Sequence, residues 1–487
     1  MKRIAYASPL NPAASGISDY SEELLPYLAR YADITPYVAD GLRPSNANLL
    51  RHMDVRALSR LDHDQRRKPY DAIIYHMGNS VENHAAIWEA LRRVPGVVVL
   101  HEFVLHHFML GYAAVTRRNV ELYRAEAAQR YGPAGARVAE LMLHGRLTEA
   151  AFDMPLCESV LDAAEGLIAH SRYVLERVAA LRPGLPAALA PMGVPLTPAI
   201  PRAQARTRLG LPQNALILAS FGHINPYKRV EAALRAVKAL RASRADLCYL
   251  LVGSSSPSYD LRAAIGRAGL EDSVIVTGYV ERRVFEDYVA AADICLNLRH
   301  PTAGETSASL LRLLGAGKPT LVTASGSFAE LPPGIAAQVD LDASEGDLIL
   351  EYCRLLAARP DIAAAMGAQA RAYVAREHTL DGAAISYMRF LAARYGWGHT
   401  PAMRAEPLWE LATTDRRPTD DDRPTMTENQ QIEPADQSTI YHLPSTIASA
   451  LAGLGATEDD SPLLEGVAWA MAELGVAEKA QSEQHQR

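Results

Sequence analysis

The chain has 487 residues and a formal net charge of −7, and 49% of its residues are hydrophobic and 22% charged. This length and composition allow a large buried core, which argues against a wholly disordered chain, a disulfide-stapled mini-domain and an integral membrane protein. The mild acidity argues against a dedicated nucleic-acid binder, which normally carries a net basic face. At about 150 residues per domain, we expect three domains, or two large ones with an appendage.

The first two-fifths of the chain alternate short apolar runs with longer amphipathic segments. The runs that predict strands are residues 4–7, 71–76, 97–100 and 166–169. A loop containing Gly16 follows the first run, and a helix is expected from Ser18 or Asp19, as its N-cap, to Tyr31. Strands that alternate with helices indicate parallel βαβ units.

The segment from His106 to Arg146 reads as a long helical insertion in this first half. It is rich in arginine and has an apolar flank, which consists of Phe108, Met109, Leu110 and Tyr112. The arginines are Arg117, Arg118, Arg124, Arg130, Arg137 and Arg146. Two interpretations stay open: contact with an anionic membrane or a lipid-linked acceptor, or a solvated helix pair whose glutamates offset the charge.

Four prolines between positions 191 and 201 indicate an interdomain linker, and the alternating pattern restarts after it. The runs that predict strands in the second half are residues 216–221, 249–252, 274–276, 294–298 and 321–323. We therefore expect a second doubly wound unit.

The last part of the chain has a different composition. Residues 413–440 are rich in Thr, Asp, Pro and Gln and are predicted to be disordered. Residues 447–454 and 463–474 are apolar enough for two short helices, which would dock on the body, on a partner or on nothing.

The four cysteines form no CxxC pair, so buried free thiols and a reducing cytoplasm are expected. No stretch approaches the roughly 18 apolar residues of a spanning helix, and the first apolar run is too short for a signal peptide. The sequence predicts a cytoplasmic protein and leaves peripheral contact with the inner membrane face open. The cysteines are Cys157, Cys248, Cys295 and Cys353.

Residues that follow predicted strands are the candidates for chemistry, because ligands of open α/β sheets bind beyond the carboxyl ends of the strands. Lys228 and Arg229 stand at a predicted helix start and suit a diphosphate, although a solvated basic pair is the alternative. Residues 304–309 precede an apolar helix. Their amides would approach a phosphate and Glu305 would accept hydrogen bonds from sugar hydroxyls, although a plain capping segment is the alternative.

In the first half, His101 ends the clearest strand, and Glu102, His106 and His107 follow. Several titratable groups at the carboxyl end of a strand indicate a site. Two other interpretations are a metal site formed by the three histidines and a histidine satisfied within the core.

These motifs together resemble the retaining glycosyltransferases of the GT-B fold, specifically glycosyltransferase family 4. The resemblance covers roughly residues 1–395 and rests on Gly222 with Lys228 six positions later, the segment 301–319 with its Gly-Lys-Pro end, and residues 190–194 and 276–280. It implies an α/β fold with two Rossmann-like doubly wound domains facing a cleft. The expected divisions are residues 1–197 (acceptor side, with a helical insertion at about 103–150), 198–385 (nucleotide-sugar side), a helix at 386–400 crossing back to the first domain, and a partly disordered tail at 401–487.

The chain departs from the family pattern at two places. His223 stands where the family has arginine, so the phosphate clamp is expected on Lys228 and Arg229. The family's Glu-x7-Glu pair falls on Gly304 and Arg312; Glu305 is shifted by one and would replace the first glutamate, whereas the second has no obvious substitute.

The resemblance implies a set of site residues. The catalytic ones are His101 and Glu305, and the donor diphosphate would be bound by Gly16, Lys228, Arg229, Thr306 and Ser307. The other cleft candidates are His223, Asn225, Gly253, Tyr279, Val280, Ser309 and Arg312.

The activity implied is transfer of a hexosyl group from a nucleotide diphosphate sugar to an acceptor hydroxyl with retention, in cell-surface polysaccharide or glycolipid synthesis. The resemblance implies no metal or other cofactor, a glycan or lipid-linked acceptor, and a tail available to a protein partner. The alternatives are a non-catalytic nucleotide-sugar-binding scaffold and another GT-B activity such as an epimerase.

Overall fold

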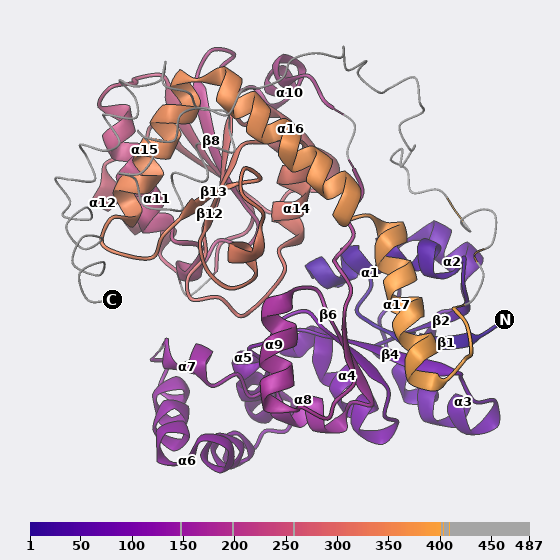
Figure 1. Cartoon of the computed structure of the whole chain (residues 1–487). Coiled ribbons are helices and arrows are strands. Elements are labelled where there is room, and N and C mark those ends of the chain that lie inside the picture. The colour runs from indigo at the N-terminus through magenta and orange to yellow at the C-terminus, as the bar shows by residue number, and fades with distance from the viewer. Residues whose placement is uncertain (147–148, 197–198, 257–258, 401–402, 404–408, 410–487) are drawn as a thin grey trace, which may run out of the picture. The chain divides into compact units, whose positions relative to one another are not determined.

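The computed structural model describes residues 1–146, 149–196, 199–256, 259–400, 403 and 409 (Figure 1). The predicted disorder at 413–440 and the predicted helices at 447–454 and 463–474 lie outside the described residues.

The described chain forms two compact units. Unit 1 comprises Met1–Pro195, Pro301–Ala308 and the described residues from Arg376 on, and unit 2 comprises Leu196–His300 and Ser309–Ala375. The sequence places residues 301–308 in the second domain, but the structure groups them with unit 1. The reason is local packing, since the amide of Val104 donates to the carbonyl of Ala303 at 2.9 Å.

Unit 1 is built on a seven-stranded parallel sheet with the order β3-β2-β1-β4-β5-β6-β7. Its strands are β1 (Arg3–Ala7), β2 (Asp33–Val38), β3 (Arg56–Ala57), β4 (Ala72–Met77), β5 (Val97–Leu100), β6 (Gly166–Ala169) and β7 (Ala187–Leu189). The four predicted strands are confirmed. The sequence misses β2, β3 and β7 because the first contains Asp33 and Pro36 and the other two are only two and three residues long.

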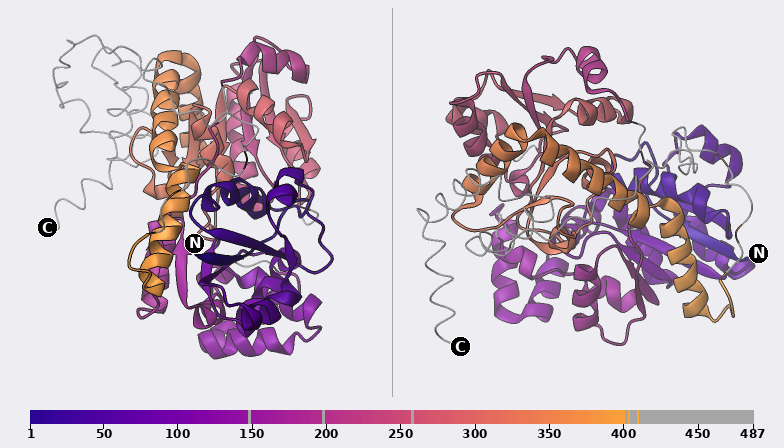
Figure 2. Two further views of the ribbon diagram at one scale, coloured as in Figure 1. Left: turned by 90° about the vertical axis from the view of Figure 1, so that its right-hand side faces the viewer. Right: turned by 45° about the horizontal axis from the view of Figure 1, so that its top comes forward.

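Helices cover both faces of this sheet, and α17 packs beside α1 (Figures 1 and 2). The helices of unit 1 are α1 (Gly16–Leu28), α2 (Ala47–His52), α3 (Leu61–Arg67), α4 (Val81–Arg93), α5 (His106–Gly111), α6 (Glu121–Leu143), α7 (Ala150–Asp153), α8 (Glu158–Ala163), α9 (Arg172–Leu181) and α17 (Leu380–Tyr395). The predicted cap of α1 is wrong: Ser15 caps the helix, and its hydroxyl oxygen accepts from the amide of Ile17 at 3.2 Å.

The predicted helical insertion is confirmed as α5, a π-helical turn (Tyr112–Thr116), α6 and α7. The predicted apolar flank is partly wrong, because Phe108 and Tyr112 are buried in the core of unit 1. Three of the arginines are paired with carboxylates: Arg117 lies 3.6 Å from Glu89, Arg124 pairs with Glu121 and Glu140, and Arg130 pairs with Glu126 and Asp162.

Unit 2 has a six-stranded parallel sheet with the order β10-β9-β8-β11-β12-β13. Its strands are β8 (Leu216–Phe221), β9 (Leu247–Val252), β10 (Val274–Gly278), β11 (Ile294–Asn297), β12 (Thr320–Thr323) and β13 (Ala337–Val339). The five predicted strands are confirmed, and the sequence misses only the three-residue β13.

Two buried clusters lie on the two faces of this second sheet. One involves α11 (Val230–Arg241), α12 (Leu261–Ala268), α15 (Glu345–Ala358) and α16 (Pro360–Glu377). The other involves α10 (Arg202–Leu209), α13 (Arg282–Ala291) and α14 (Ala308–Gly315). Unit 2 is therefore a doubly wound α/β unit, as predicted.

All four cysteines are buried and free, as predicted. None of the described helices is long and apolar enough to cross a lipid bilayer.

Candidate functional site

Three imidazoles gather where neighbouring strands of unit 1 end. His76 is the penultimate residue of β4, His101 follows β5 directly, and His170 follows β6 directly. Because β4, β5 and β6 are adjacent and parallel, their carboxyl ends meet at one edge of the sheet and bring the three side chains together. We call His76, His101 and His170 the histidine cluster.

The rings of the histidine cluster touch one another. His76 Nδ1 and His101 Nε2 share a hydrogen bond of 2.8 Å, and the ring centroids of His101 and His170 are 4.9 Å apart. The ring of Tyr20 in α1 is nearly perpendicular to those of His101 and His170, with centroid distances of 5.6 and 5.4 Å. His101 is thus held from two neighbouring strands and one helix.

Burial keeps the histidine cluster uncharged. Desolvation lowers the pKa of His76 and His101 well below the usual value, and it lowers the pKa of His170 to about 4. His170 Nδ1 bonds the carbonyl of Ala190 at 2.8 Å, so this nitrogen carries the proton. At neutral pH, the histidine cluster provides neutral hydrogen-bonding groups and no positive charge.

The other two histidines that follow β5 do not join the cluster. His106 is tied to the insertion, since Nδ1 bonds the carbonyl of Met154 at 2.7 Å and Nε2 bonds the hydroxyl of Tyr123 at 2.5 Å. The ring of His107 lies against Phe152 of α7. Within the described part of the chain, no three His, Cys, Asp or Glu side chains are arranged to hold a metal ion, so the metal interpretation of the three histidines receives no structural support.

The segment Pro301–Ala308 brings Glu305 into unit 1. Gly304 packs so closely that a Cβ atom there would lie 2.9 Å from the Cβ of Phe103, two residues after His101. Thr302 donates its hydroxyl to Glu305 Oε2 at 3.0 Å, and its oxygen accepts from the amide of Gly304 at 3.0 Å. Glu305 and Ser307 are buried, and Thr306 lies between them.

Gly16 is the first residue of α1, on the same edge of the sheet as the histidine cluster. A Cβ atom at Gly16 would meet nothing within 4 Å. The backbone at Gly16 therefore faces open space, and its predicted role near the diphosphate stays a prediction.

The loop between β8 and α11 carries the cations of unit 2. Lys228 Nζ donates to the carbonyl of Phe221, the last residue of β8, at 2.8 Å. Gly222 has φ +92, and a Cβ atom there would lie 3.3 Å from Lys228 Nζ and 3.9 Å from Ser309 Oγ. The loop therefore folds Lys228 back over a glycine, so that its ammonium group lies at the carboxyl end of the central strand.

Arg229 is the N-cap residue of α11, at the helix start that the sequence predicts. It has left-handed backbone angles (φ 53, ψ 36), directly before α11 and after the single 3-10 turn Pro226–Lys228. Its guanidinium makes a bidentate ion pair with Glu345, with Nε 2.8 Å from Oε1 and Nη2 bonded to Oε2. Glu345 is the first residue of α15 and only 3% exposed.

The neighbouring loop after β9 supports this region. Gly253 is required for packing, because a Cβ atom there would lie 2.2 Å from the carbonyl oxygen of Gly222. His223 Nδ1 and Ser254 Oγ share a hydrogen bond of 3.1 Å. Asn225 Oδ1 is buried and accepts no hydrogen bond from the residues described.

Two further candidates follow β10. Tyr279 is 78% exposed, whereas Val280 packs partly against the core of unit 2. The amide of Gly253 donates to Thr277 Oγ1 at 3.3 Å, which joins the end of β10 to the loop after β9.

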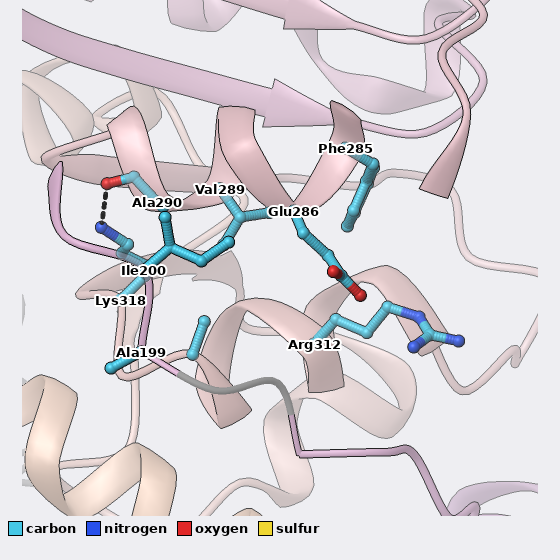
Figure 3. A pocket seen from close by; sticks show the side chains of 9 residues that line it. Ala199, Ile200, Phe285, Glu286, Val289, Ala290, Arg312 and Lys318 are labelled. Atoms are coloured by element: carbon cyan, nitrogen blue, oxygen red, sulfur yellow. Dashed lines mark hydrogen bonds between the residues drawn. The ribbon is translucent and has the colours of Figure 1, made fainter. Parts of the chain in front are cut away.

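Arg312 lies apart, on the wall of a cavity of about 80 Å³ between α13 and α14. In Figure 3 its side chain and that of Glu286 point toward each other from the two helices. The opposite end of the cavity is closed by Lys318, whose ammonium donates to the carbonyls of Ala290 and Ala292 at 2.8 and 2.9 Å.

In unit 1 the structure places Tyr20 of α1 against His101 and Gly304 against Phe103, and in unit 2 it brings Lys228 together with Gly222, Gly253 and Ser309. Sequence reasoning missed the partners that hold these groups. His76, His170 and Tyr20 surround His101, and Glu345 holds Arg229. His76 and His170 could have been predicted as site residues, since each stands at the end of an apolar run. No sequence pattern points to Glu345.

Part of the chain is similar in sequence to known glycosyltransferases. Residues 215–356, from β8 to α15, match the family model described as Glycosyl transferases group 1. D-inositol 3-phosphate glycosyltransferase from Streptomyces scabiei is 29% identical over 281 residues, which span 54% of this chain and 55% of that protein. 2-Deoxystreptamine glucosyltransferase from Streptomyces kanamyceticus is 27% identical over 152 residues, which span 28% of this chain and 39% of that protein.

Solved structures share the fold. Sucrose-phosphate synthase from Thermosynechococcus elongatus aligns with a TM-score of 0.58 at 17% identity, over 82% of this chain and 100% of that one. HepE from Anabaena, in complex with UDP and glucose, aligns with a TM-score of 0.57 at 16% identity, over 81% and 100%. The chain therefore has the predicted α/β fold of the GT-B glycosyltransferases, with two parallel sheets.

Proposed function

We propose that this chain is a glycosyltransferase that moves a hexosyl group from a nucleotide diphosphate sugar to an acceptor hydroxyl, with retention of the anomeric configuration. The observation that carries the proposal is the β8–α11 loop, which lies inside the matched family region and sets Lys228 over Gly222 at the end of a central strand. The GT-B fold and the curated relatives support it. Retention is supported by the motif resemblance alone.

We assign the donor diphosphate to this loop. Negative charge develops on the diphosphate as the sugar departs, and a fixed ammonium group with nearby amides stabilises that charge without a metal ion. Lys228 supplies the charge, and we expect the contribution of Arg229 to depend on Glu345, which engages its guanidinium. His223 and Asn225 stand in the same loop, and Ser309 lies near Gly222.

We assign the transferred sugar to the strand ends of unit 1. A neutral His101 donates or accepts hydrogen bonds without attracting the anionic leaving group, and a buried site excludes the water that would hydrolyse the donor. Glu305, held by Thr302, would accept hydrogen bonds from sugar hydroxyls. Thr306 and Ser307 would add polar groups beside it, and the open position at Gly16 would admit the ligand.

For the acceptor we propose a glycan or lipid-linked molecule, as in cell-surface polysaccharide or glycolipid synthesis. The tip of the insertion before α6 supports contact with an anionic membrane surface. There Val115 and Leu122 are exposed apolar side chains, and Arg117 and Arg118 are exposed between them. Apolar side chains beside arginines favour peripheral binding to anionic lipid.

One experiment tests the reaction class. The protein is incubated with UDP-, GDP- and dTDP-sugars, with and without lipid extracts, glycans, inositol phosphate and 2-deoxystreptamine. Nucleoside diphosphate release is then measured. Acceptor-dependent release supports the transferase, and release of a rearranged nucleotide sugar would indicate an epimerase. Binding without turnover under every condition would replace the proposal with a non-catalytic scaffold.

A further inference from the structure

Arg229 occupies a backbone conformation that its side chain does not favour. Its φ of 53 is left-handed, a region that residues with a Cβ atom rarely adopt, and of all the described residues only Arg118 and Leu156 share this feature among the non-glycines. Such a conformation persists only where the surrounding structure imposes it.

An ion pair with Glu345 engages the guanidinium of Arg229. The pair is bidentate and joins residues that are 116 positions apart. It ties the residue before α11 to the first residue of α15, and these two helices pack against each other. Since Glu345 is almost fully buried, removing Arg229 would leave a desolvated carboxylate.

The conformation of Arg229 fixes the position of Lys228. The amide of Lys228 donates to the carbonyl of Asn225 at 3.1 Å, and the amide of Arg229 donates to that of Pro226 at 3.2 Å, which closes the turn. The carbonyl of Arg229 then accepts from the amide of Ala233 at 3.1 Å and starts α11. A helical backbone at position 229 would continue the turn in a different direction and carry Lys228 Nζ away from the carbonyl of Phe221.

We propose that Glu345 and Arg229 are positioning residues, which hold the loop so that Lys228 presents its ammonium group to the diphosphate. Arg229 therefore acts through the loop and not as the main phosphate ligand. This inference rests on the proposed function, because it names the residues that set the geometry of the same anion-binding loop.

The two roles for Arg229 predict opposite effects of changes at Glu345. If Arg229 is a direct ligand, Glu345→Gln weakens the competing ion pair and nucleoside diphosphates bind more tightly. If the pair is a positioning device, Glu345→Gln and Glu345→Ala weaken UDP or GDP binding by about tenfold or more, the range expected for loss of a bidentate charge-assisted contact. Asp347→Asn is the matched control, since Asp347 is an exposed carboxylate in the same first turn of α15.

A rescue experiment distinguishes a role of Arg229 in positioning the loop from a general loss of stability. Glycine adopts φ near +53 without strain, so Arg229→Gly combined with Glu345→Gln removes both the strain and the buried charge. This double variant should bind nucleoside diphosphates more tightly than Arg229→Ala combined with Glu345→Gln. Equal binding by the two double variants would contradict a role for the left-handed conformation.

The experiment uses the full chain, with UDP, GDP and dTDP titrated in a calorimeter and amide hydrogen exchange measured over residues 222–233. The expected result is weaker binding and faster exchange in both Glu345 variants and unchanged behaviour in Asp347→Asn. Wild-type affinity in Glu345→Ala, with reduced affinity in Lys228→Ala, would overturn the inference and leave the proposed function standing. If the wild-type chain binds none of UDP, GDP and dTDP, the proposed function fails, and unchanged exchange in Glu345→Ala would overturn the positioning role independently.

Discussion

The side chains at the carboxyl ends of the strands differ in charge between the two parallel sheets. In unit 1 the strand ends present His76, His101 and His170, which are buried and uncharged at neutral pH. In unit 2 the corresponding edge presents Lys228 and Arg229 on a loop, with Arg229 paired to a buried carboxylate. The same architecture thus provides buried neutral imidazoles at the strand ends of one unit and a loop with two cationic side chains in the other. Under the proposed function, this difference would suit a donor with an uncharged sugar and a charged diphosphate.

The largest expected effect comes from removing the cations of unit 2. Lys228→Ala combined with Arg229→Ala should lower kcat/KM for the donor by at least about a hundredfold, because nothing else in the loop offsets the charge of the leaving group to the same extent. Nucleoside diphosphate release measures it. Lys238→Ala, on the exposed face of α11, is the control and should behave as the wild type. Normal turnover in the double variant would break the assignment of the diphosphate to this loop.

A change in unit 1 should separate the two regions kinetically. His101→Asn should lower kcat by about ten- to a hundredfold, the range for a lost hydrogen-bonding group, while UDP or GDP affinity stays unchanged. Lys228→Ala should weaken nucleotide affinity as well. Steady-state kinetics combined with calorimetry of the free nucleotide distinguishes the cases. If His101→Asn weakened nucleotide binding as much as Lys228→Ala, the assignment of the sugar to unit 1 and the diphosphate to unit 2 would be wrong.

The sequence predicts the strands and the residues that follow them better than it predicts the partners of those residues. Strands that are continuous apolar runs, such as β5 and β8, are predicted with their correct bounds, because a strand buried on both faces is apolar at every position. His101 directly follows β5 and Lys228 stands in the loop after β8, and the sequence makes them site candidates for that reason. His76 is 25 positions from His101, and Glu345 is 116 from Arg229, so only the strand order and the helix packing bring these partners together. Local patterns carry no information about those contacts.

The buried neutral histidines also predict how the stability of each unit changes as the pH falls. The buried histidines that the structure describes all belong to unit 1: His76, His84, His101, His106, His170 and His378. Burial lowers the pKa of His84 and His170 from 6.5 to about 4, so the folded state binds protons less readily than the unfolded chain. Their contribution to the free energy of unfolding is complete above pH 6.5 and is lost as the pH falls toward 4.

At pH 5 each of these two imidazoles should cost about 2 kcal/mol of stability relative to pH 7. Amide hydrogen exchange should therefore accelerate in the strands of unit 1 between pH 6.5 and 4 more than in β8 and β9, after correction for the intrinsic rate. His170→Gln should reduce this acid sensitivity, whereas His52→Gln, at an exposed position, should not. Equal acid sensitivity of both sheets would show that the histidine cluster does not set the pH response.

The smallest effect tests how closely the cationic loop is packed. Gly222→Ala adds a Cβ atom 3.3 Å from Lys228 Nζ on a backbone with φ +92, so both the left-handed conformation and the position of the ammonium group are disturbed. The ammonium is at the end of a flexible side chain and can move by a few tenths of an ångström, so UDP or GDP binding should weaken by only about three- to tenfold. Gly266→Ala in α12, where the nearest atom would be 3.4 Å away, is the control. Because the ammonium of Lys228 also bonds the carbonyl of Phe221, a small displacement should cost affinity without releasing the loop. Faster hydrogen exchange over residues 222–233 in Gly222→Ala would show instead that the glycine, and not the Arg229–Glu345 pair, holds the loop in place.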